Sequence, residues 1–337
     1  MVLRAAVIGC GKIGSEFADD PRIEGIHSHA GAYAACPETQ LVAVCDSDPV
    51  KLEQCGKRWQ VAARYLDPRQ MFAENKTDIV SICTPDATHY DLIRAAIQTH
   101  GVRAVLAEKP LALRLDHARE VVSLAKQRGI VLAVNYIRRY ADTHIWLKEK
   151  LDAGEIGKLQ TIGGYYSKGI LHNGTHWIDL ARFFAGEVVR VWGIDTRKES
   201  NDDPTLDVIL EFESGVSGHL QGCDASAFSI FEMDLIGTRG RARLLDSGYV
   251  VEIDQVAPSA YFSGYLELKR KERIERGLGS VLLNAVQDLV NCVKENRTPR
   301  CAGEDGVAAL KIALAGRASA QSGRPMILSR DGWQTAS

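Results

Sequence analysis

The first 136 residues alternate short apolar runs with amphipathic stretches, and this alternation constrains the fold most. Each run holds four or five residues, nearly all Val, Ile, Leu, Ala or Cys: 5–9, 41–45, 79–83, 104–107 and 131–134. Unbroken runs of this length are typical of strands buried on both faces of a sheet. Between two of them, Ala118, Val121, Val122 and Ala125 follow helical spacing, and Gly129 stands where helices commonly end. Strands that alternate with helices predict right-handed βαβ units and a parallel sheet.

The second half of the chain follows a different period. Apolar residues at 206, 208, 210 and 212 alternate with acidic residues apart from Ile209, and the segment 231–235 repeats the pattern. Such alternation predicts strands with one buried and one more polar face, as in an antiparallel sheet. Helical spacing recurs in three places: 175–185, 282–293 and 307–314.

A length of 337 residues exceeds what one hydrophobic core usually supports, so we expect two domains. The boundary falls just after the last parallel-type strand. We predict a doubly wound parallel α/β domain over residues 1–136. An α+β domain with a large, mostly antiparallel sheet is predicted over residues 137–337.

The balance of 41 basic and 43 acidic residues gives a formal net charge of −2. Nucleic acids and anionic lipid surfaces favour clustered positive charge, so the composition argues against both as partners. No apolar run approaches the roughly 20 residues that span a bilayer. Residues 1–9 are too short in their apolar part for a signal peptide. We expect no nucleic-acid or membrane partner.

The eight cysteines form no C-x-x-C pair and share no zinc-type spacing with histidines. Several lie in predicted buried strands, where a free cysteine packs like a small apolar residue. We therefore expect no metal site, a reducing compartment and a cytoplasmic location.

A glycine-rich turn follows the first predicted strand: Gly9-Cys10-Gly11-Lys12-Ile13-Gly14. In such a G-x-G-x-x-G the first glycine permits a tight turn, the second lets a pyrophosphate approach, and the third admits close helix packing. Amide groups of a helix opening here would face the phosphates. Asp46, ending the second strand, can accept hydrogen bonds from both ribose hydroxyls of NAD and would repel the 2′-phosphate of NADP. We predict a Rossmann dinucleotide site that prefers NAD; the alternative is a structural turn with a capping Asp46.

The distance from Gly14 to Asp46 exceeds the roughly 20 residues expected in this fold. The excess suggests an insertion around residues 19–27, because Pro21 and Gly25 interrupt any helix there. Residues 28–35 then complete the helix. We interpret His27 and His29 as surface histidines of this loop, with contact to the substrate as the alternative.

Three further segments, in this order, make a family resemblance specific. Cys-Thr-Pro-Asp-Ala-Thr-His follows the third strand at 83–89, Glu-Lys-Pro follows the fourth at 108–110, and Gly-Thr-His-Trp-Ile-Asp enters a helix at 174–179. With the glycine loop and with residues 303–306, they resemble the Gfo/Idh/MocA family of glucose–fructose oxidoreductase and inositol dehydrogenase. The resemblance implies a Rossmann domain followed by a domain for substrate binding and oligomerisation.

Lys109 and His176 are the predicted catalytic residues. Lys109 follows a parallel strand at its carboxyl end, where open α/β sheets bind ligands. A partly desolvated lysine beside a cationic nicotinamide ring loses proton affinity and can hold or accept the proton of a substrate hydroxyl. His176 titrates nearest neutral pH and is a natural general base. The resemblance implies that Lys109 orients the reacting hydroxyl and that His176 exchanges its proton.

The remaining site predictions concern the cofactor and the substrate. Asp179 is three residues after His176 on one helix face, and by resemblance it contacts substrate hydroxyls, with an ion pair or a cap as the alternative. Asn135 ends the fifth strand and is assigned either to cofactor binding or to a turn cap. His89 and Glu108 are implied near the nicotinamide ribose. The predicted cofactor set is Gly9, Gly11, Lys12, Ile13, Gly14, Asp46, Thr84, Pro85, His89, Glu108, Lys109 and Asn135.

One position departs from the family pattern. Many sugar and inositol dehydrogenases place an aspartate four residues before the histidine, and this chain has His172 there. A histidine can hydrogen-bond a substrate but does not stabilise a protonated His176, which puts the familiar proton relay in doubt. The change suggests a nucleotide-linked or carboxylated sugar, for which Lys168, Arg138 and Arg182 are candidate anion contacts; the alternative for each is an ordinary surface or structural charge.

The leading hypothesis is an NAD-dependent dehydrogenase or reductase of a secondary hydroxyl on a sugar, cyclitol or nucleotide sugar. A second hypothesis is a lyase or hydrolase that oxidises a sugar transiently and recycles its bound NAD. A third is a non-catalytic dinucleotide sensor, against which the presence of Lys109 and His176 argues. The resemblance also suggests that the second domain forms a homodimer or homotetramer.

Overall fold

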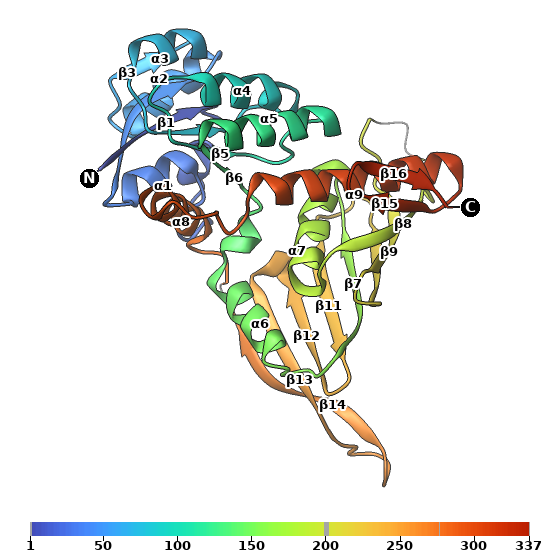
Figure 1. Ribbon diagram of the computed structural model, residues 1–337. Coiled ribbons are helices and arrows are strands. Elements are labelled where there is room, and N and C mark those ends of the chain that lie inside the picture. Colours follow the sequence, from blue (N-terminus) through green and yellow to red (C-terminus); the bar gives the residue numbers. More distant parts are fainter. Residues whose placement is uncertain (1, 199–201, 276, 337) are drawn as a thin grey trace. The chain divides into compact units, whose positions relative to one another are not determined.

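A computed structural model describes residues 2–198, 202–275 and 277–336 (Figure 1). The chain divides into two compact units, and neither is one continuous stretch. The first unit comprises Met1–Tyr140 and Gly279–Val307, and the second comprises Ala141–Leu278 and Ala308–Ser337.

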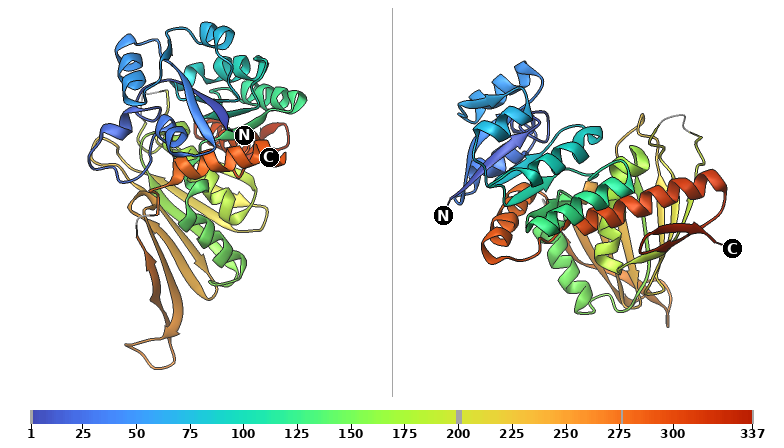
Figure 2. Two further views of the ribbon diagram at one scale, coloured as in Figure 1. Left: turned by 90° about the vertical axis from the view of Figure 1, so that its left-hand side faces the viewer. Right: turned by 45° about the horizontal axis from the view of Figure 1, so that its top comes forward.

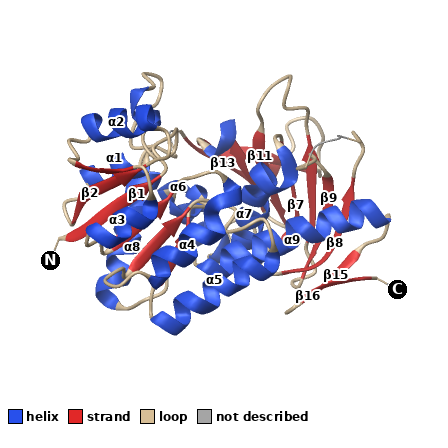
Figure 3. Cartoon of the chain, turned by 90° about the horizontal axis from the view of Figure 1, so that it is seen from above, coloured by secondary structure: helices blue, strands red, loops and turns tan. Residues whose placement is uncertain are grey.

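The first unit contains a parallel sheet in the order β3-β2-β1-β4-β5-β6. Its strands β1 and β2 lie side by side in Figure 3. Its strands are β1 (Leu3–Ile8), β2 (Thr39–Cys45), β3 (Ala63–Tyr65), β4 (Ile79–Ile82), β5 (Ala104–Ala107) and β6 (Val131–Val134). Its helices are α1 (His29–Ala35), α2 (Pro49–Arg58), α3 (Pro68–Glu74), α4 (His89–Gln98), α5 (Leu115–Arg128) and α8 (Val281–Glu295), with 3-10 turns η1 (Glu16–Asp19), η2 (Asp86–Thr88) and η3 (Ile137–Tyr140). This strand order is that of a doubly wound Rossmann sheet, as predicted.

The structure confirms the strands predicted for the first unit, and most of their residues are buried. All four residues of β4 and of β5 are buried, which explains their unbroken apolar sequence. The short strand β3 was not predicted, since three half-buried residues give no periodic signal. Helix α5 ends at Gly129, whose φ of +65° is the left-handed conformation expected of a terminating glycine.

The prediction that a helix opens directly at the glycine loop is wrong. Residues 11–15 make turns, η1 follows, and α1 begins only at His29. The N–H groups of His29 and Ala30 nevertheless donate to the carbonyls of Ile13 and Gly14, both at 3.0 Å. Helix α1 therefore continues the hydrogen bonding of the glycine-loop turn after a looped-out insertion. The prediction that residues 28–35 complete the helix is confirmed.

Helix α8 corrects the predicted division of the chain. All residues after 136 were assigned to the second domain, but α8 belongs to the first unit. It contacts α1, β5 and β6 (Figure 1). Val281, Leu282, Ala285, Val286 and Leu289 are buried on it, so its apolar face completes the core of the parallel sheet.

The second unit contains a sheet in the order β14-β13-β12-β11-β7-β10-β9-β8-β15-β16. Its strands are β7 (Leu159–Tyr166), β8 (Val188–Ile194), β9 (Asp207–Phe212), β10 (Ser217–Gly222), β11 (Phe231–Gly237), β12 (Gly240–Leu245), β13 (Val250–Pro258), β14 (Leu266–Ile274), β15 (Met326–Ser329) and β16 (Gly332–Thr335). Its helical segments are α6 (Asp142–Asp152), η4 (Gly169–Gly174), α7 (Thr175–Ala185) and η5 (Asp246–Gly248), and α9 (Gly303–Ser322) begins in the first unit and ends in the second. Among the described strands of this second sheet only β7 and β10 pair in parallel, so the predicted mostly antiparallel sheet is confirmed.

Alternate residues of this sheet are buried, as the period of two predicted. The pattern is regular on β11 and β12, where buried positions alternate with half-buried ones. Strands β13 and β14 form a long hairpin that extends beyond their neighbours (Figure 2). Its connecting segment exposes Tyr261, Phe262 and Tyr265. In the described part of the chain, no helix has the length and apolar character needed to cross a membrane.

Candidate active site

The glycine loop after β1 has the shape that the dinucleotide prediction requires. Gly9 has a φ of +97°, and a Cβ on it would lie 2.5 Å from the carbonyl oxygen of Cys83. A Cβ on Gly14 would lie 1.9 Å from the Gly9 carbonyl oxygen, whereas a Cβ on Gly11 would meet no atom within 4 Å. The first and third glycines are therefore required by the loop itself, and the open side of Gly11 fits an approaching pyrophosphate.

The Asp46 carboxylate is held at the end of β2 by two backbone donors. The N–H of Cys10 donates to its Oδ2 at 2.6 Å, and the N–H of Asp48 donates to its Oδ1 at 2.8 Å. Asp46 is partly exposed, so each oxygen keeps a lone pair that a ribose hydroxyl can use. Asp48 caps α2 instead, since its Oδ1 accepts from the N–H groups of Val50 and Lys51.

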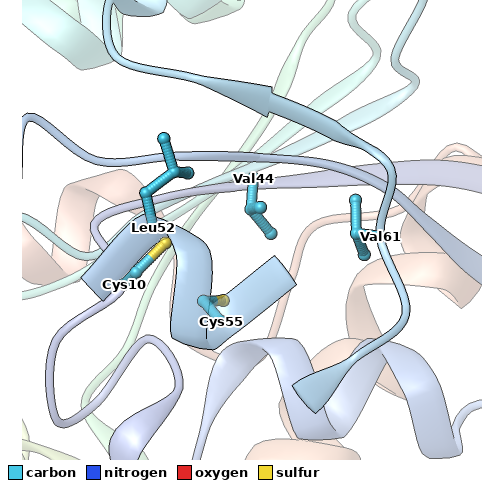
Figure 4. Packing of buried hydrophobic residues seen from close by; sticks show 5 residues of the cluster. All are labelled: Cys10, Val44, Leu52, Cys55 and Val61. Carbon is cyan, nitrogen blue, oxygen red and sulfur yellow. The ribbon is translucent and has the colours of Figure 1, made fainter. Parts of the chain in front are cut away.

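A small apolar cluster supports the loop from within the first unit (Figure 4). Cys10 is buried in this cluster together with Val44, Leu52, Cys55 and Val61. Contact with Cys55, followed by burial, raises the pKa of the Cys10 thiol well above its ordinary value. Cys10 is therefore a neutral, packed side chain, in agreement with the prediction that the cysteines act as small apolar residues.

His89 holds the segment after β4 in place through hydrogen bonds to backbone carbonyls. This histidine is fully buried, with Nδ1 2.6 Å from the carbonyl oxygen of Pro110 and Nε2 2.7 Å from that of Thr84. It ties the loops after β4 and β5 to each other. Thr84 is partly exposed and Pro85 exposed at the same strand end. Binding of the cofactor by these three residues stays a prediction, and the observed contacts of His89 are with backbone.

Glu108 and Lys109 directly follow β5, and both are buried. The Oε1 of Glu108 lies 3.0 Å from Nε2 of His29 and accepts a 2.6 Å hydrogen bond from Nδ2 of Asn135. Its Oε2 accepts a bond of 3.3 Å from the N–H of Lys109. Burial alone raises the pKa of the Glu108 carboxyl, but His29, Asn135 and Lys109 outweigh burial and lower it below its ordinary value. Glu108 is therefore an enclosed, ionised carboxylate next to Lys109.

Asn135 follows β6 and is fully buried. Its amide nitrogen donates a hydrogen bond to Glu108, but its carbonyl oxygen Oδ1 has no hydrogen-bond partner among the described residues. A buried acceptor left in this state favours a donor from a bound molecule, because an unpaired buried polar atom costs about 1–3 kcal/mol. Asn135, the glycine loop and Asp46 together fit a dinucleotide at the carboxyl edge of the parallel sheet.

Three other predicted residues of the first unit are accessible. Lys12 is exposed in the glycine loop, and Ile13 beside it is partly exposed. Arg138 is partly exposed in η3. Their binding roles stay predictions.

In the second unit, His172 and His176 occupy consecutive helical segments, η4 and α7. The N–H groups of Leu171 and His172 donate to the Asp203 carboxylate at 2.7 and 2.9 Å, which fixes this turn. His172 is exposed, and His176 in the first turn of α7 is partly exposed. Lys168, at the start of η4, is exposed and has a φ of +71°. His172 thus has access to solvent, whereas His176 exposes only part of its surface and its Nδ1 is buried.

Asp179 differs from these histidines because it is 1% exposed. Its Oδ1 lies 3.8 Å from Nη1 of Arg182, whose Nη2 also pairs with Oε1 of Glu187 at 2.5 Å. This is the ion pair that the sequence left open as an alternative. Contact of Asp179 with a substrate stays a prediction.

His29 is the residue that sequence reasoning misplaced. It was interpreted as a surface histidine of the inserted loop, but it is fully buried in α1 and touches Glu108. Ser81 of β4, which bonds His29, and Tyr33 of α1, which bonds Ser81, gave no sequence signal. The signal that could have placed His29 correctly was the helix predicted over residues 28–35, which contains it.

Comparison with known proteins agrees with this geometry. The Gfo/Idh/MocA oxidoreductase family, NAD-binding Rossmann fold, matches residues 3–136, and the C-terminal alpha/beta domain of the same family matches residues 163–328. Myo-inositol 2-dehydrogenase of Thermotoga maritima is 24% identical over 97% of this chain and 98% of its own length. The NAD(+)-dependent scyllo-inositol 2-dehydrogenase of Bacillus subtilis is 24% identical over 97% and 96%.

A solved structure shows the same fold. The NAD binding oxidoreductase from Klebsiella pneumoniae superposes with a TM-score of 0.82 at 21% identity, covering 98% of this chain and 100% of that one. The two family matches together span most of the chain and both units. The protein therefore belongs to the Gfo/Idh/MocA family of oxidoreductases.

Proposed function

We propose that this protein is an NAD-dependent dehydrogenase acting on a secondary hydroxyl of a cyclitol or sugar. The observation that supports this best is the gathering of the glycine loop, Asp46 and Lys109 at the ends of β1, β2 and β5. Carboxyl ends of parallel strands share one edge, which is where open α/β sheets bind ligands. The two inositol dehydrogenases that resemble the chain over nearly its full length favour a cyclitol-like substrate.

Bound NAD would supply the hydride acceptor for the carbon that bears the hydroxyl. The backbone at Gly11 would hold the pyrophosphate, Asp46 would hold the adenosine ribose, and Oδ1 of Asn135 would accept a hydrogen bond from the bound cofactor. Lys109 binds and orients the hydroxyl oxygen through its Nζ, and the ionised Glu108 beside it favours the charged ammonium that donates this bond. His176 takes the hydroxyl proton as general base, which balances the loss of hydride from the same carbon.

His172 replaces the acid that relatives place four residues before the histidine. We propose that it binds a substrate hydroxyl or anionic group, with Lys168 and Arg138 as further contacts. The exposure of His172 and Lys168 supports such a role.

The preference for NAD is proposed from the two backbone donors that orient Asp46. A fixed carboxylate at this position repels the 2′-phosphate of NADP. Replacing Asp46 with Ser should lower the ratio of kcat/KM with NAD to kcat/KM with NADP by about tenfold, since the removed repulsion is of order 1 kcal/mol. The test is the ratio of kcat/KM with the two cofactors, and an unchanged ratio contradicts this role of Asp46.

Self-association is also proposed, with a second copy covering apolar residues of the second unit. Tyr261, Phe262 and Tyr265 are 83, 69 and 69% exposed at the end of the β13–β14 hairpin. Clustered exposed aromatic side chains are typical of interaction surfaces. Light scattering after size-exclusion chromatography measures the mass, and a monomer contradicts this part of the proposal.

The experiment that tests the function is a substrate survey. The protein is incubated with NAD or NADP and with inositols, sugars, uronates and nucleotide sugars, while the absorbance of reduced nicotinamide is followed. We expect a stoichiometric rise with NAD and one substrate class. Product without a rise would indicate a recycling lyase or hydrolase. Binding of NAD without any product would indicate a sensor, and either outcome contradicts the proposed dehydrogenase.

A further inference from the structure

A row of buried polar side chains in the first unit ends at the residue before Lys109. We name it the buried relay, and its members are Tyr33, Ser81, His29, Glu108 and Asn135. They come from α1, β4 and the ends of β5 and β6, and each is at most 9% exposed. The Tyr33 hydroxyl lies 2.8 Å from Oγ of Ser81, which lies 2.8 Å from Nδ1 of His29. The other ring nitrogen of His29 reaches Glu108 at 3.0 Å.

The direction of these hydrogen bonds follows from the chemistry of their ends. An ionised carboxylate only accepts, so Nε2 of His29 carries the hydrogen that it shares with Glu108. Nδ1 can then accept from the hydroxyl of Ser81, and Ser81 Oγ can accept from the hydroxyl of Tyr33. Every hydroxyl and ring donor of the relay is used in this arrangement. Glu108 is thus held from the interior by His29 and from the side by the amide of Asn135.

The relay also determines the charge of Glu108. Burial opposes ionisation of this carboxyl, and the contact with His29 heads the interactions that lower its pKa despite burial. The other titratable groups around Glu108 and Tyr33 are Lys109, Cys83 and Cys36. Burial raises the pKa of the Cys83 thiol well above its ordinary value, so Cys83 stays neutral and adds no second negative charge beside Glu108. Without His29, the remaining groups named here as favouring the carboxylate are Lys109 and Asn135.

We propose that His29 is a positioning residue: backed by Ser81 and Tyr33, it keeps the Glu108 carboxylate ionised and aimed, and so fixes the protonation behaviour of Lys109. His29 acts through Glu108 and is not assigned contact with the substrate. The geometry that supports the proposal is the unbroken sequence of short contacts from α1 to the end of β5. The consequence for catalysis rests on the proposed function, in which Lys109 orients the reacting hydroxyl.

Two variants of His29 separate positioning from packing. His29→Gln keeps an N–H donor within reach of Glu108, whereas His29→Leu fills the space without one. In His29→Leu, Glu108 loses the contact that offsets its burial, so its pKa rises, and a protonated Glu108 no longer supplies the charge that favours the Lys109 ammonium. We expect one limb of the pH profile of kcat/KM to be displaced from its wild-type position by about one pH unit or more. At pH values between the wild-type limb and the displaced limb, the rate should then differ about tenfold from that of the wild type. His29→Gln should keep the profile of the wild type.

A second readout does not depend on turnover. A carboxylate whose pKa is lowered in the folded state stabilises the fold above its unfolded pKa, and this stability is lost as pH falls through the folded pKa. In His29→Leu the pKa of Glu108 rises, so the melting temperature should fall below that of the wild type by more at pH 8 than at pH 5. Adding Glu108→Gln should remove this extra loss at pH 8, because the neutral amide does not depend on the hydrogen bond that His29 donates to the carboxylate.

His144 supplies a matched control. It is also fully buried, in α6 of the second unit, and its Nε2 lies 3.0 Å from the carbonyl oxygen of Gly248. His144→Leu should lower the melting temperature without changing the pH profile of kcat/KM. The inference is overturned if His29→Leu keeps the wild-type pH profile, or if Glu108→Gln leaves its melting loss at pH 8 unchanged. If the wild type turns over no substrate, the proposed function fails, and the melting series still decides whether His29 sustains the Glu108 charge.

Discussion

The two units expose their polar residues in different ways. In the first, the ends of β1, β2, β4, β5 and β6 each bring a motif to one edge, because all strands of a parallel sheet point the same way. In the second, neighbouring strands mostly run in opposite directions, so strand ends are divided between two edges. Its candidate site residues lie instead on η4 and α7. Chain order therefore predicts a binding edge in the first unit but gives no equivalent information for the second.

The same units differ in what controls charge. Glu108, Lys109, His29 and Asn135 are all less than 10% exposed, so the charges of Glu108 and Lys109 depend on each other and on their two polar neighbours. His172 and His176 remain accessible to solvent. A substitution in the first unit should therefore affect its neighbours strongly, whereas a substitution at the histidines of the second should act locally.

The largest expected effects come from one predicted catalytic residue in each unit. Lys109→Met and His176→Asn should each lower kcat by about 10²–10⁴-fold, the usual contribution of a positioned acid or base. Lys51→Met, at an exposed lysine of α2, is the control and should keep the wild-type rate. Steady-state kinetics with NAD measures all three. A Lys109→Met enzyme with full activity would remove the catalytic assignment of the first unit.

The glycine loop provides the next test, because two of its glycines meet different surroundings. Gly14→Ala would bring a Cβ within 1.9 Å of the Gly9 carbonyl and should destabilise the protein by about 1–3 kcal/mol. Gly11→Ala meets no atom within 4 Å and should fold with the wild-type melting temperature while binding NAD about tenfold more weakly. Calorimetry and NAD titration separate the two effects. Wild-type NAD affinity in Gly11→Ala would contradict a pyrophosphate at this position.

The smallest expected effect on catalysis is that of replacing Asp179. This replacement tests whether Asp179 has a structural role or contacts the substrate. Since Asp179 is enclosed with Arg182, Asp179→Asn should lower the free energy of unfolding by roughly 1–3 kcal/mol. Glu187→Gln removes the exposed partner of the same arginine and should change it by less than about 0.5 kcal/mol. Denaturant unfolding measures both. A rise in KM without loss of stability in Asp179→Asn would favour contact with the substrate.

Much of the first unit could be predicted because buried parallel strands and terminating residues leave local signals. The strands near 79–83, 104–107 and 131–134 and the stop of α5 at Gly129 are of this kind. The path between Gly14 and His29 was harder. Pro21 and Gly25 indicate an interruption, but no local pattern reveals that the helix resumes on the carbonyls of Ile13 and Gly14.

The two sheets, the glycine loop with Asp46, and the motifs that contain Lys109 and His176 could be predicted from the sequence. These features depend on residue type and short-range spacing, which a linear pattern records. The tertiary structure alone decided that α8 returns to the first unit, that Asp179 is paired with Arg182, and that His29 lies against Glu108. His29 and Glu108 are 79 positions apart, and contacts over such separations arise only when strands and helices pack, so no local signal announces them.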